Sequence, residues 1–169
     1  ETGFNMGKLD NLGAIVTGAA EGIGEAIAIE LASNGAKVAC IDFNEESGND
    51  TAKKIIDSGG EATFIKTDIS DPDQVKKMVN SSVEFLGSID ILVNNAAKFT
   101  FGAVEDVSQE EWEDILKVNV IGYSTCVKEA LPHLKKSGKS AVVNLASVSS
   151  LIAGPKFVPY NTSKGAVLM

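Results

Sequence analysis

Short apolar segments alternate with amphipathic or polar segments along this chain of 169 residues. The apolar segments predict buried strands, and several of the intervening segments predict helices because their apolar residues recur at spacings of three and four. Five near-continuous apolar strands alternating with helices predict a doubly wound α/β fold, in which helices cover both faces of a mostly parallel sheet. Strands are expected at residues 12–17, 37–42, 62–67, 89–93 and 140–146, and helices at 23–34, 45–57, 72–86 and 109–131.

Capping residues support two of these helices. Asp71 is followed by Pro72 and, three residues after the cap, by Gln74, which is the order typical of a helix start. Ser108 and Glu111 have the spacing of a capping box, in which each residue satisfies a backbone N–H of the other. We therefore expect helices to begin just after Asp71 and Ser108.

The charge balance excludes two classes of partner. The chain has 15 basic residues, all of them lysine, and 23 acidic residues, which gives a formal net charge of −8. A field of that sign repels phosphate backbones and anionic lipid, so neither nucleic acid nor a membrane surface is expected as a partner. Cys40 and Cys126 each lie in an apolar stretch, which favours buried free thiols in a reducing cytoplasm over a disulfide.

The length predicts one domain, over residues 6–169. Residues 1–5 precede Met6 and are interpreted as a remnant of recombinant expression. An apolar run of about 18 residues would predict a membrane span, and a basic region followed by an apolar one would predict a signal peptide. The sequence has neither pattern, so we expect a soluble cytoplasmic protein.

Three glycines stand between the first predicted strand and the first predicted helix. Glycine lets the backbone turn sharply and approach a pyrophosphate, whose charge meets unpaired N–H groups at the helix N-terminus. The segment 17–24 therefore predicts a dinucleotide-binding turn. Its candidate cofactor residues are Gly18, Glu21, Gly22, Ile23 and Gly24.

Asp42 ends the second predicted strand, 18 residues after Gly24. A carboxylate at this position accepts hydrogen bonds from the adenosine ribose hydroxyls and repels a 2′-phosphate, so it favours NAD over NADP. Glu21 and Phe43 agree with this prediction, because both stand where a basic residue could otherwise meet a phosphate. We also expect no catalytic metal, since no His, Cys and carboxylate residues have ligand spacing.

These motifs resemble those of the classical short-chain dehydrogenases/reductases. TGAAEGIG at 17–24 is similar to the family's TGxxxGxG, and NNAA at 94–97 resembles its NNAG, with Ala97 in place of the glycine. The resemblance covers nearly all of residues 9–169 and implies a Rossmann-type sheet with an NAD site at its carboxyl edge. It implies that Asp68 and Ile69 contact the adenine and that Asn95, Ala96 and Ala97 also border the cofactor.

The same resemblance implies a catalytic tetrad of Asn119, Ser147, Tyr160 and Lys164. Tyr160 and Lys164 are four residues apart, so on a helix they share a face, and an ammonium there stabilises a phenolate. The implied roles are proton exchange by Tyr160, cofactor binding by Tyr160 and Lys164, a hydrogen bond from Ser147 to the substrate oxygen, and orientation of a water by Asn119. Two structural interpretations stay open: a buried helix amide for Asn119 and a strand-end turn for Ser147.

Members of this family normally continue past the helix that carries Tyr160 and Lys164. The resemblance therefore implies that this chain, which ends at Met169, lacks a sixth and a seventh strand and most of the substrate pocket. Part of that pocket is expected at residues 149–159, whose apolar side chains favour an apolar ligand.

Two functions are consistent with these features. In the first, the chain is most of an NAD-dependent oxidoreductase that acts on an alcohol or ketone and forms a homodimer or homotetramer at full length. In the second, the short form is a dinucleotide-binding or scaffold protein without turnover. An open reading frame beyond Met169 would favour the first interpretation, and an immediate stop codon would favour the second.

Overall fold

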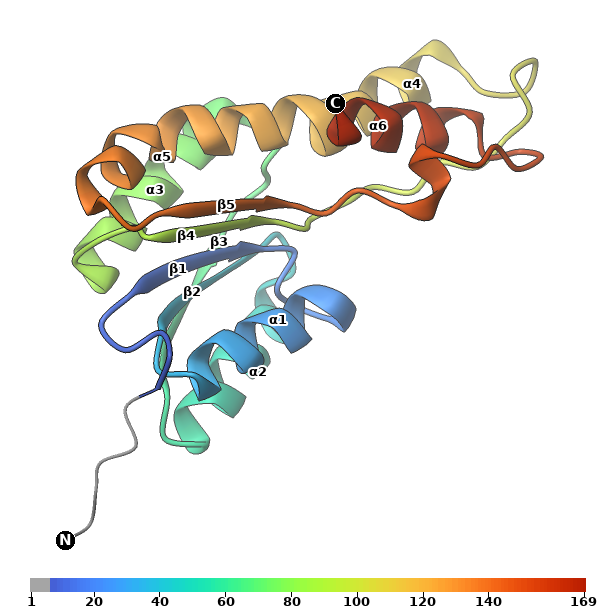
Figure 1. Ribbon diagram of the computed structural model, residues 1–169. Helices are drawn as coiled ribbons and strands as arrows, with labels where there is room; N and C mark the ends of the chain where they lie inside the picture. The colour runs from blue at the N-terminus through green and yellow to red at the C-terminus, as the bar shows by residue number, and fades with distance from the viewer. Residues whose placement is uncertain (1–6) are drawn as a thin grey trace, which may run out of the picture.

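The computed structural model describes residues 7–169, so the interpretation of residues 1–5 lies outside the described residues. Its strands are β1 (Gly13–Thr17), β2 (Lys37–Asp42), β3 (Glu61–Lys66), β4 (Ile91–Asn94) and β5 (Ala141–Asn144). They form one parallel sheet in the order β3-β2-β1-β4-β5, as Figure 1 shows. The predicted fold class is confirmed.

The helices are α1 (Gly22–Ser33), α2 (Glu45–Asp57), α3 (Pro72–Leu86), α4 (Gln109–Leu116), α5 (Tyr123–Ser137) and α6 (Val158–Leu168). A π-helical turn, η1 (Lys117–Gly122), joins α4 to α5, and a short 3₁₀ helix, η2 (Val148–Ser150), precedes α6. In Figure 1, α1 and α2 cover one face of the sheet, and α3 and α5 cover the other. Among the described residues, no helix has both the length and the apolar character needed to cross a membrane.

Successive side chains of β1 enter two separate cores. Ile15 packs with Met78 of α3 and Cys126 of α5, whereas Val16 packs with Ala28 of α1 on the opposite face. This alternation follows from the two-residue period of a strand. It explains why both faces of β1 are apolar, as expected of a central strand in a parallel sheet.

The predicted helix starts are confirmed, with one difference in detail. Ser108 and Glu111 form a reciprocal capping box, and Asp71 accepts hydrogen bonds from the backbone N–H groups of Asp73 and Gln74. The amide nitrogen of Gln74 donates a hydrogen bond to the Asp71 carboxylate at 2.9 Å, but its amide oxygen does not accept from the Asp71 backbone N–H, so the two residues form no capping box. The amide oxygen of Gln74 accepts a hydrogen bond from the backbone N–H of Asp68 instead, at 2.9 Å.

The prediction of one continuous helix over residues 109–131 was wrong in two respects. The π-helical turn η1 interrupts it, and the helix then continues past Pro132 to Ser137. Gly138 ends it in the left-handed conformation, at φ +70°, which costs glycine little. The interruption could not be predicted from periodicity, because it depends on contacts between Asn119 and distant residues.

A buried carboxylate joins three elements at the amino edge of the sheet. Asp90 accepts hydrogen bonds from the backbone N–H of Gly13 at 2.8 Å, from the hydroxyl of Ser88 at 2.6 Å, and from the hydroxyl of Ser137. Burial raises the pKa of Asp90, but the three hydrogen bonds outweigh it and hold the pKa below its usual range. The charged form of Asp90 therefore stabilises the fold.

We expect Asp90→Ala to lower the free energy of unfolding by about 2–3 kcal/mol, because it leaves three donors without their acceptor. The pKa of Asp90 is lowered in the folded state, so its stabilisation is complete above about pH 4 and is lost as the pH falls through the native value. Urea denaturation between pH 3 and 7 measures both effects. Asp57→Ala, which removes an exposed partner of Lys53, is the control and should cost under about 1 kcal/mol.

Candidate active site

A cavity of about 940 Å³ opens at the carboxyl edge of the sheet. It lies beside the point where the chain order reverses, between β1 and β4, which is where doubly wound folds bind ligands. Its volume is at the upper end of the range of about 300–1,000 Å³ that is typical of ligand pockets. Predicted cofactor residues that line it are Gly18, Glu21, Gly22, Ile23, Asp42, Phe43, Asp68, Ile69, Asn95, Ala96, Ala97, Tyr160 and Lys164.

The glycine turn between β1 and α1 is a close backbone contact. A Cβ on Gly24 would lie 1.9 Å from the carbonyl oxygen of Gly18, so no other residue fits at Gly24 without movement of the backbone. Gly18 has a φ of +66°, a conformation that side chains disfavour. Gly24 is buried and does not line the cavity. The structure therefore gives Gly24 the role of allowing the turn, and its predicted contact with the cofactor stays a prediction.

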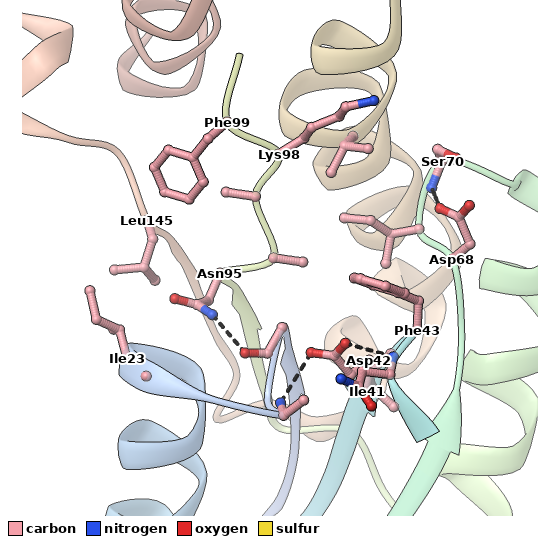
Figure 2. Close-up of a pocket in the computed structure, with 18 of the residues that line it drawn as sticks. Ile23, Ile41, Asp42, Phe43, Asp68, Ser70, Asn95, Lys98, Phe99 and Leu145 are labelled. Carbon is pink, nitrogen blue, oxygen red and sulfur yellow. Dashed lines mark hydrogen bonds between the residues drawn. The ribbon is translucent and has the colours of Figure 1, made fainter. Parts of the chain in front are cut away.

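Asn95 holds this turn against β4, as Figure 2 shows. Its side-chain amide donates hydrogen bonds to the carbonyl oxygens of Thr17 and Gly18, both at 3.1 Å. The hydroxyl of Thr17 accepts hydrogen bonds from the backbone N–H groups of Asn95 at 3.0 Å and Ala96 at 3.2 Å. The turn and the loop after β4 therefore form one rigid wall of the cavity.

Asp42 lies at the end of β2, and its carboxylate is held by the backbone. Its two oxygens accept hydrogen bonds from the N–H groups of Ala20 and Asn44, each at 3.0 Å. The carboxylate borders the cavity beside Phe43, whose side chain is 74% exposed. Its fixed position leaves further acceptor capacity for hydroxyl groups, because a carboxylate has about four lone-pair directions.

Tyr160 and Lys164 line the same cavity from α6. Both are buried, and the Lys164 ammonium donates hydrogen bonds to the carbonyl oxygen of Leu145 at 2.6 Å and to the Tyr123 hydroxyl at 3.4 Å. Burial lowers the pKa of Lys164 to about 8, so the side chain remains a cation at pH 7. The shared helix face predicted for Tyr160 and Lys164 is confirmed.

Asn119 and Ser147 are not among the residues that line the cavity. Asn119 is fully buried in the π-helical turn, where its amide oxygen accepts from the N–H of Lys98 at 2.7 Å. Its amide nitrogen donates to the carbonyl of Lys98 and to the hydroxyl of Ser163, both at 3.0 Å. The structure thus gives Asn119 an anchoring role, and its orientation of a water stays a prediction.

Ser147 caps the short helix η2. Its hydroxyl accepts a hydrogen bond from the N–H of Ser149 at 3.1 Å, and its own N–H donates to the hydroxyl of Ser150 at 3.2 Å. The Ser150 hydroxyl in turn donates to the carbonyl of Lys164 at 2.7 Å. These bonds fit the turn-forming interpretation of Ser147, and its contact with a substrate oxygen stays a prediction.

The sequence analysis did not identify three aromatic residues of this region. Tyr123 contacts the Lys164 ammonium, Phe99 lines the cavity beside Tyr160, and Phe101 packs next to Phe99. Phe99 and Phe101 follow the NNAA motif in a loop. A loop has no helix or strand periodicity, so the sequence does not predict which way their side chains point. Residues 149–159, expected in the substrate pocket, are not among the lining residues of this cavity.

Two further charged residues that line the cavity, Lys98 and Asp114, pair with each other. Lys98 binds Asp114 through an ion pair of 2.6 Å, in which both side chains are 41% exposed. Within residues 7–169, no group of three or more His, Cys, Asp and Glu residues is placed to hold a metal ion.

Comparison with known proteins agrees with this geometry. The sequence model for short chain dehydrogenases matches residues 13–169. An uncharacterized oxidoreductase of Thermotoga maritima is 37% identical over 92% of this chain and 60% of its own length. The versicolorin reductase of Emericella nidulans is 36% identical over 95% of this chain and 61% of its own length.

A solved structure shares the fold closely. The short-chain dehydrogenase/reductase of Burkholderia phymatum, crystallised in complex with NAD, superposes with a TM-score of 0.92 and 32% sequence identity. The match covers 95% of this chain and 57% of that protein. The chain thus spans about three fifths of the length of the relatives it matches.

We expect Gly24→Ala to disrupt the glycine turn, because the added Cβ would overlap the carbonyl of Gly18. The free energy of unfolding should fall by about 1–3 kcal/mol, the usual cost of overpacking, and binding of the dinucleotide should weaken with it. Gly165→Ala is the matched control: its Cβ meets open space in α6, so stability should stay equal or rise slightly. Urea denaturation compares the two variants, and equal stabilities would contradict the close contact.

Proposed function

The chain belongs to the short-chain dehydrogenase family, and we propose that it is an NAD-dependent oxidoreductase acting on an alcohol or a ketone. One observation carries the proposal. Tyr160 and Lys164 line the same cavity as the glycine turn and Asp42, so a proton-transfer pair and a dinucleotide cradle share one space.

The residues around the cavity fit NAD. The close contact at Gly24 and the open turn at Gly22, where a Cβ would meet nothing within 4 Å, leave room for a pyrophosphate beside the start of α1. Asp42 would accept hydrogen bonds from the adenosine ribose, and Asp68 and Ile69 would border the adenine. The NAD bound by the Burkholderia phymatum relative supports this choice of cofactor.

The chain's own contribution is to bind, orient and move a proton. NAD, when bound, supplies the hydride acceptor or donor. The Tyr160 hydroxyl would exchange a proton with the substrate oxygen, and the Lys164 ammonium, charged at pH 7, would stabilise the phenolate and bind the nicotinamide ribose. Ser147 would hold the substrate oxygen, and Asn119 would orient a water that passes protons to Lys164.

The contacts of Lys164 support its proposed role. The carbonyl of Leu145 and the hydroxyl of Tyr123 are neutral acceptors, so they position the ammonium without cancelling its charge. A carboxylate in either place would neutralise that charge. The ammonium therefore has no anion among its hydrogen-bond partners, and its charge is available to a phenolate at Tyr160.

We expect Tyr160→Phe to lower kcat by at least about 100-fold, because it removes the hydroxyl that exchanges the proton. NAD affinity should stay within a few-fold, since the ring is retained. The test uses the full-length gene product with a panel of secondary alcohols and follows NADH absorbance. Thr162→Val removes a hydroxyl from the exposed face of the same helix and should leave turnover unchanged. Equal kcat for Tyr160→Phe and the parent protein would remove Tyr160 from the mechanism.

We expect Asp42→Asn to reduce the preference for NAD over NADP by at least about tenfold, because the substitution removes the charge that repels a 2′-phosphate. The amide oxygen can keep one of the two backbone hydrogen bonds that the carboxylate accepts. The ratio of kcat/KM for the two cofactors is the readout. Asp50→Asn, on the exposed side of α2, controls for loss of one negative charge. An unchanged ratio would assign the preference to other residues.

A further inference from the structure

Four aromatic rings pack on one another at one end of the cavity, and we call them the aromatic cluster. Phe99 stacks on Tyr160 with ring centroids 4.8 Å apart and planes 21° apart, and it stacks on Phe101 at 6.0 Å and 29°. Phe157 meets the Phe101 ring edge-on at 4.7 Å. The Tyr160 and Phe101 centroids are themselves 6.3 Å apart, with planes 47° apart, so the rings of Phe99, Phe101 and Tyr160 form a triangle in which each contacts the other two.

The outer rings of the cluster are exposed although the inner one is buried. Phe99 is 59% exposed and Phe101 is 55% exposed, whereas Tyr160 is 9% exposed. Adjacent exposed aromatic rings form a contiguous apolar patch, and such patches mark ligand-binding grooves or interaction surfaces. Figure 2 shows the Phe99 ring on the side of Leu145, away from Asp68 and Phe43. Phe99 therefore lines the cavity near Tyr160 and not at the end proposed for adenosine, and Phe101 packs beside Phe99.

The cluster is held in place by the backbone. Its rings come from two segments far apart in the sequence, and a backbone hydrogen bond of 2.8 Å from the N–H of Gly102 to the carbonyl of Lys156 joins them. Lys156 has a φ of +62°, a conformation that residues other than glycine adopt rarely, and it leads directly into Phe157. These features fix the backbone of the two segments relative to each other and so bring their aromatic rings together.

We propose that Phe99 and Phe101 form one wall of the substrate site and that the substrate is a flat ring system, aromatic or conjugated, with its hydroxyl or carbonyl beside Tyr160. This inference rests on the proposed function and names its substrate class. Aromatic rings prefer offset stacks at centroid separations of about 4.5–7 Å, and the cluster already holds its rings within that range. A further flat ring can pack against the exposed surface of Phe99 and Phe101 over its whole face, whereas a puckered ring of equal size makes contact at fewer atoms.

The test compares two hydroxyl compounds of the same skeleton, 2-naphthol and decahydro-2-naphthol, which differ in the flatness of their rings and in the acidity of the hydroxyl; the phenylalanine variants below separate the two effects, because they change only the contact with the rings. Calorimetry measures their binding to the full-length gene product saturated with NADH, where neither probe can react because both are already reduced. We expect 2-naphthol to bind about tenfold tighter, which corresponds to about 1.4 kcal/mol. In Phe99→Leu and Phe101→Leu, the difference should fall below threefold. Phe85→Leu, on α3 and outside the cavity, should retain it.

Three other outcomes would contradict the substrate class or the proposed function. If the complex with NADH forms but the two probes bind equally, the flat-ring inference is overturned while the proposed function stands. If Phe99→Leu and Phe101→Leu lose stability and keep the tenfold difference, the two rings pack against protein, and the inference is again overturned. If NADH does not bind at all, the proposed function fails, and the substrate class fails with it.

Discussion

The site depends on the hydrogen bonds between Thr17 and Asn95. These residues stand at the ends of β1 and β4, where the chain leaves the sheet in two directions, so without a link the two loops would separate. The Thr17 hydroxyl donates to the carbonyl of Val93 and accepts from two backbone N–H groups, and the Asn95 amide returns two hydrogen bonds to the glycine turn. The link fixes the turn so that Gly24 can approach Gly18.

A second link, through Asn119, positions the other side of the cavity. Its amide joins the Lys98 backbone, in the loop after β4, to Ser163 on α6. The π-helical turn places this amide inward, and Gly122 in the same turn approaches Ile69, where a Cβ would lie 3.0 Å away. One local distortion thus positions the loop that carries Phe99, the helix that carries Tyr160, and the segment that carries Ile69.

Much of the fold could be predicted from the sequence, and part of the site could not. The strand periods, the caps at Asp71 and Ser108, and the glycine turn are local signals, and the structure has each of them. The π-helical turn and the partners of Asn119 depend on contacts between residues far apart in the chain. For the same reason the Tyr123 contact with Lys164 was missed: its position on an apolar helix face indicates packing, and only the fold brings the two side chains together.

Lys164 connects the chemistry of the site to the edge of the sheet. Burying a cation is costly, and the lowered pKa of about 8 reflects that cost. The carbonyl of Leu145 offsets part of it through a bond of 2.6 Å, and the N–H of Leu145 is itself held by the carbonyl of Asn94 at 2.9 Å. The ammonium therefore takes its position from the end of β5, which takes its position from β4. Because Asn95 directly follows β4, Lys164 and the glycine turn are both positioned by the end of this strand. A shift of β5 would therefore disturb Lys164 before it disturbed the glycine turn.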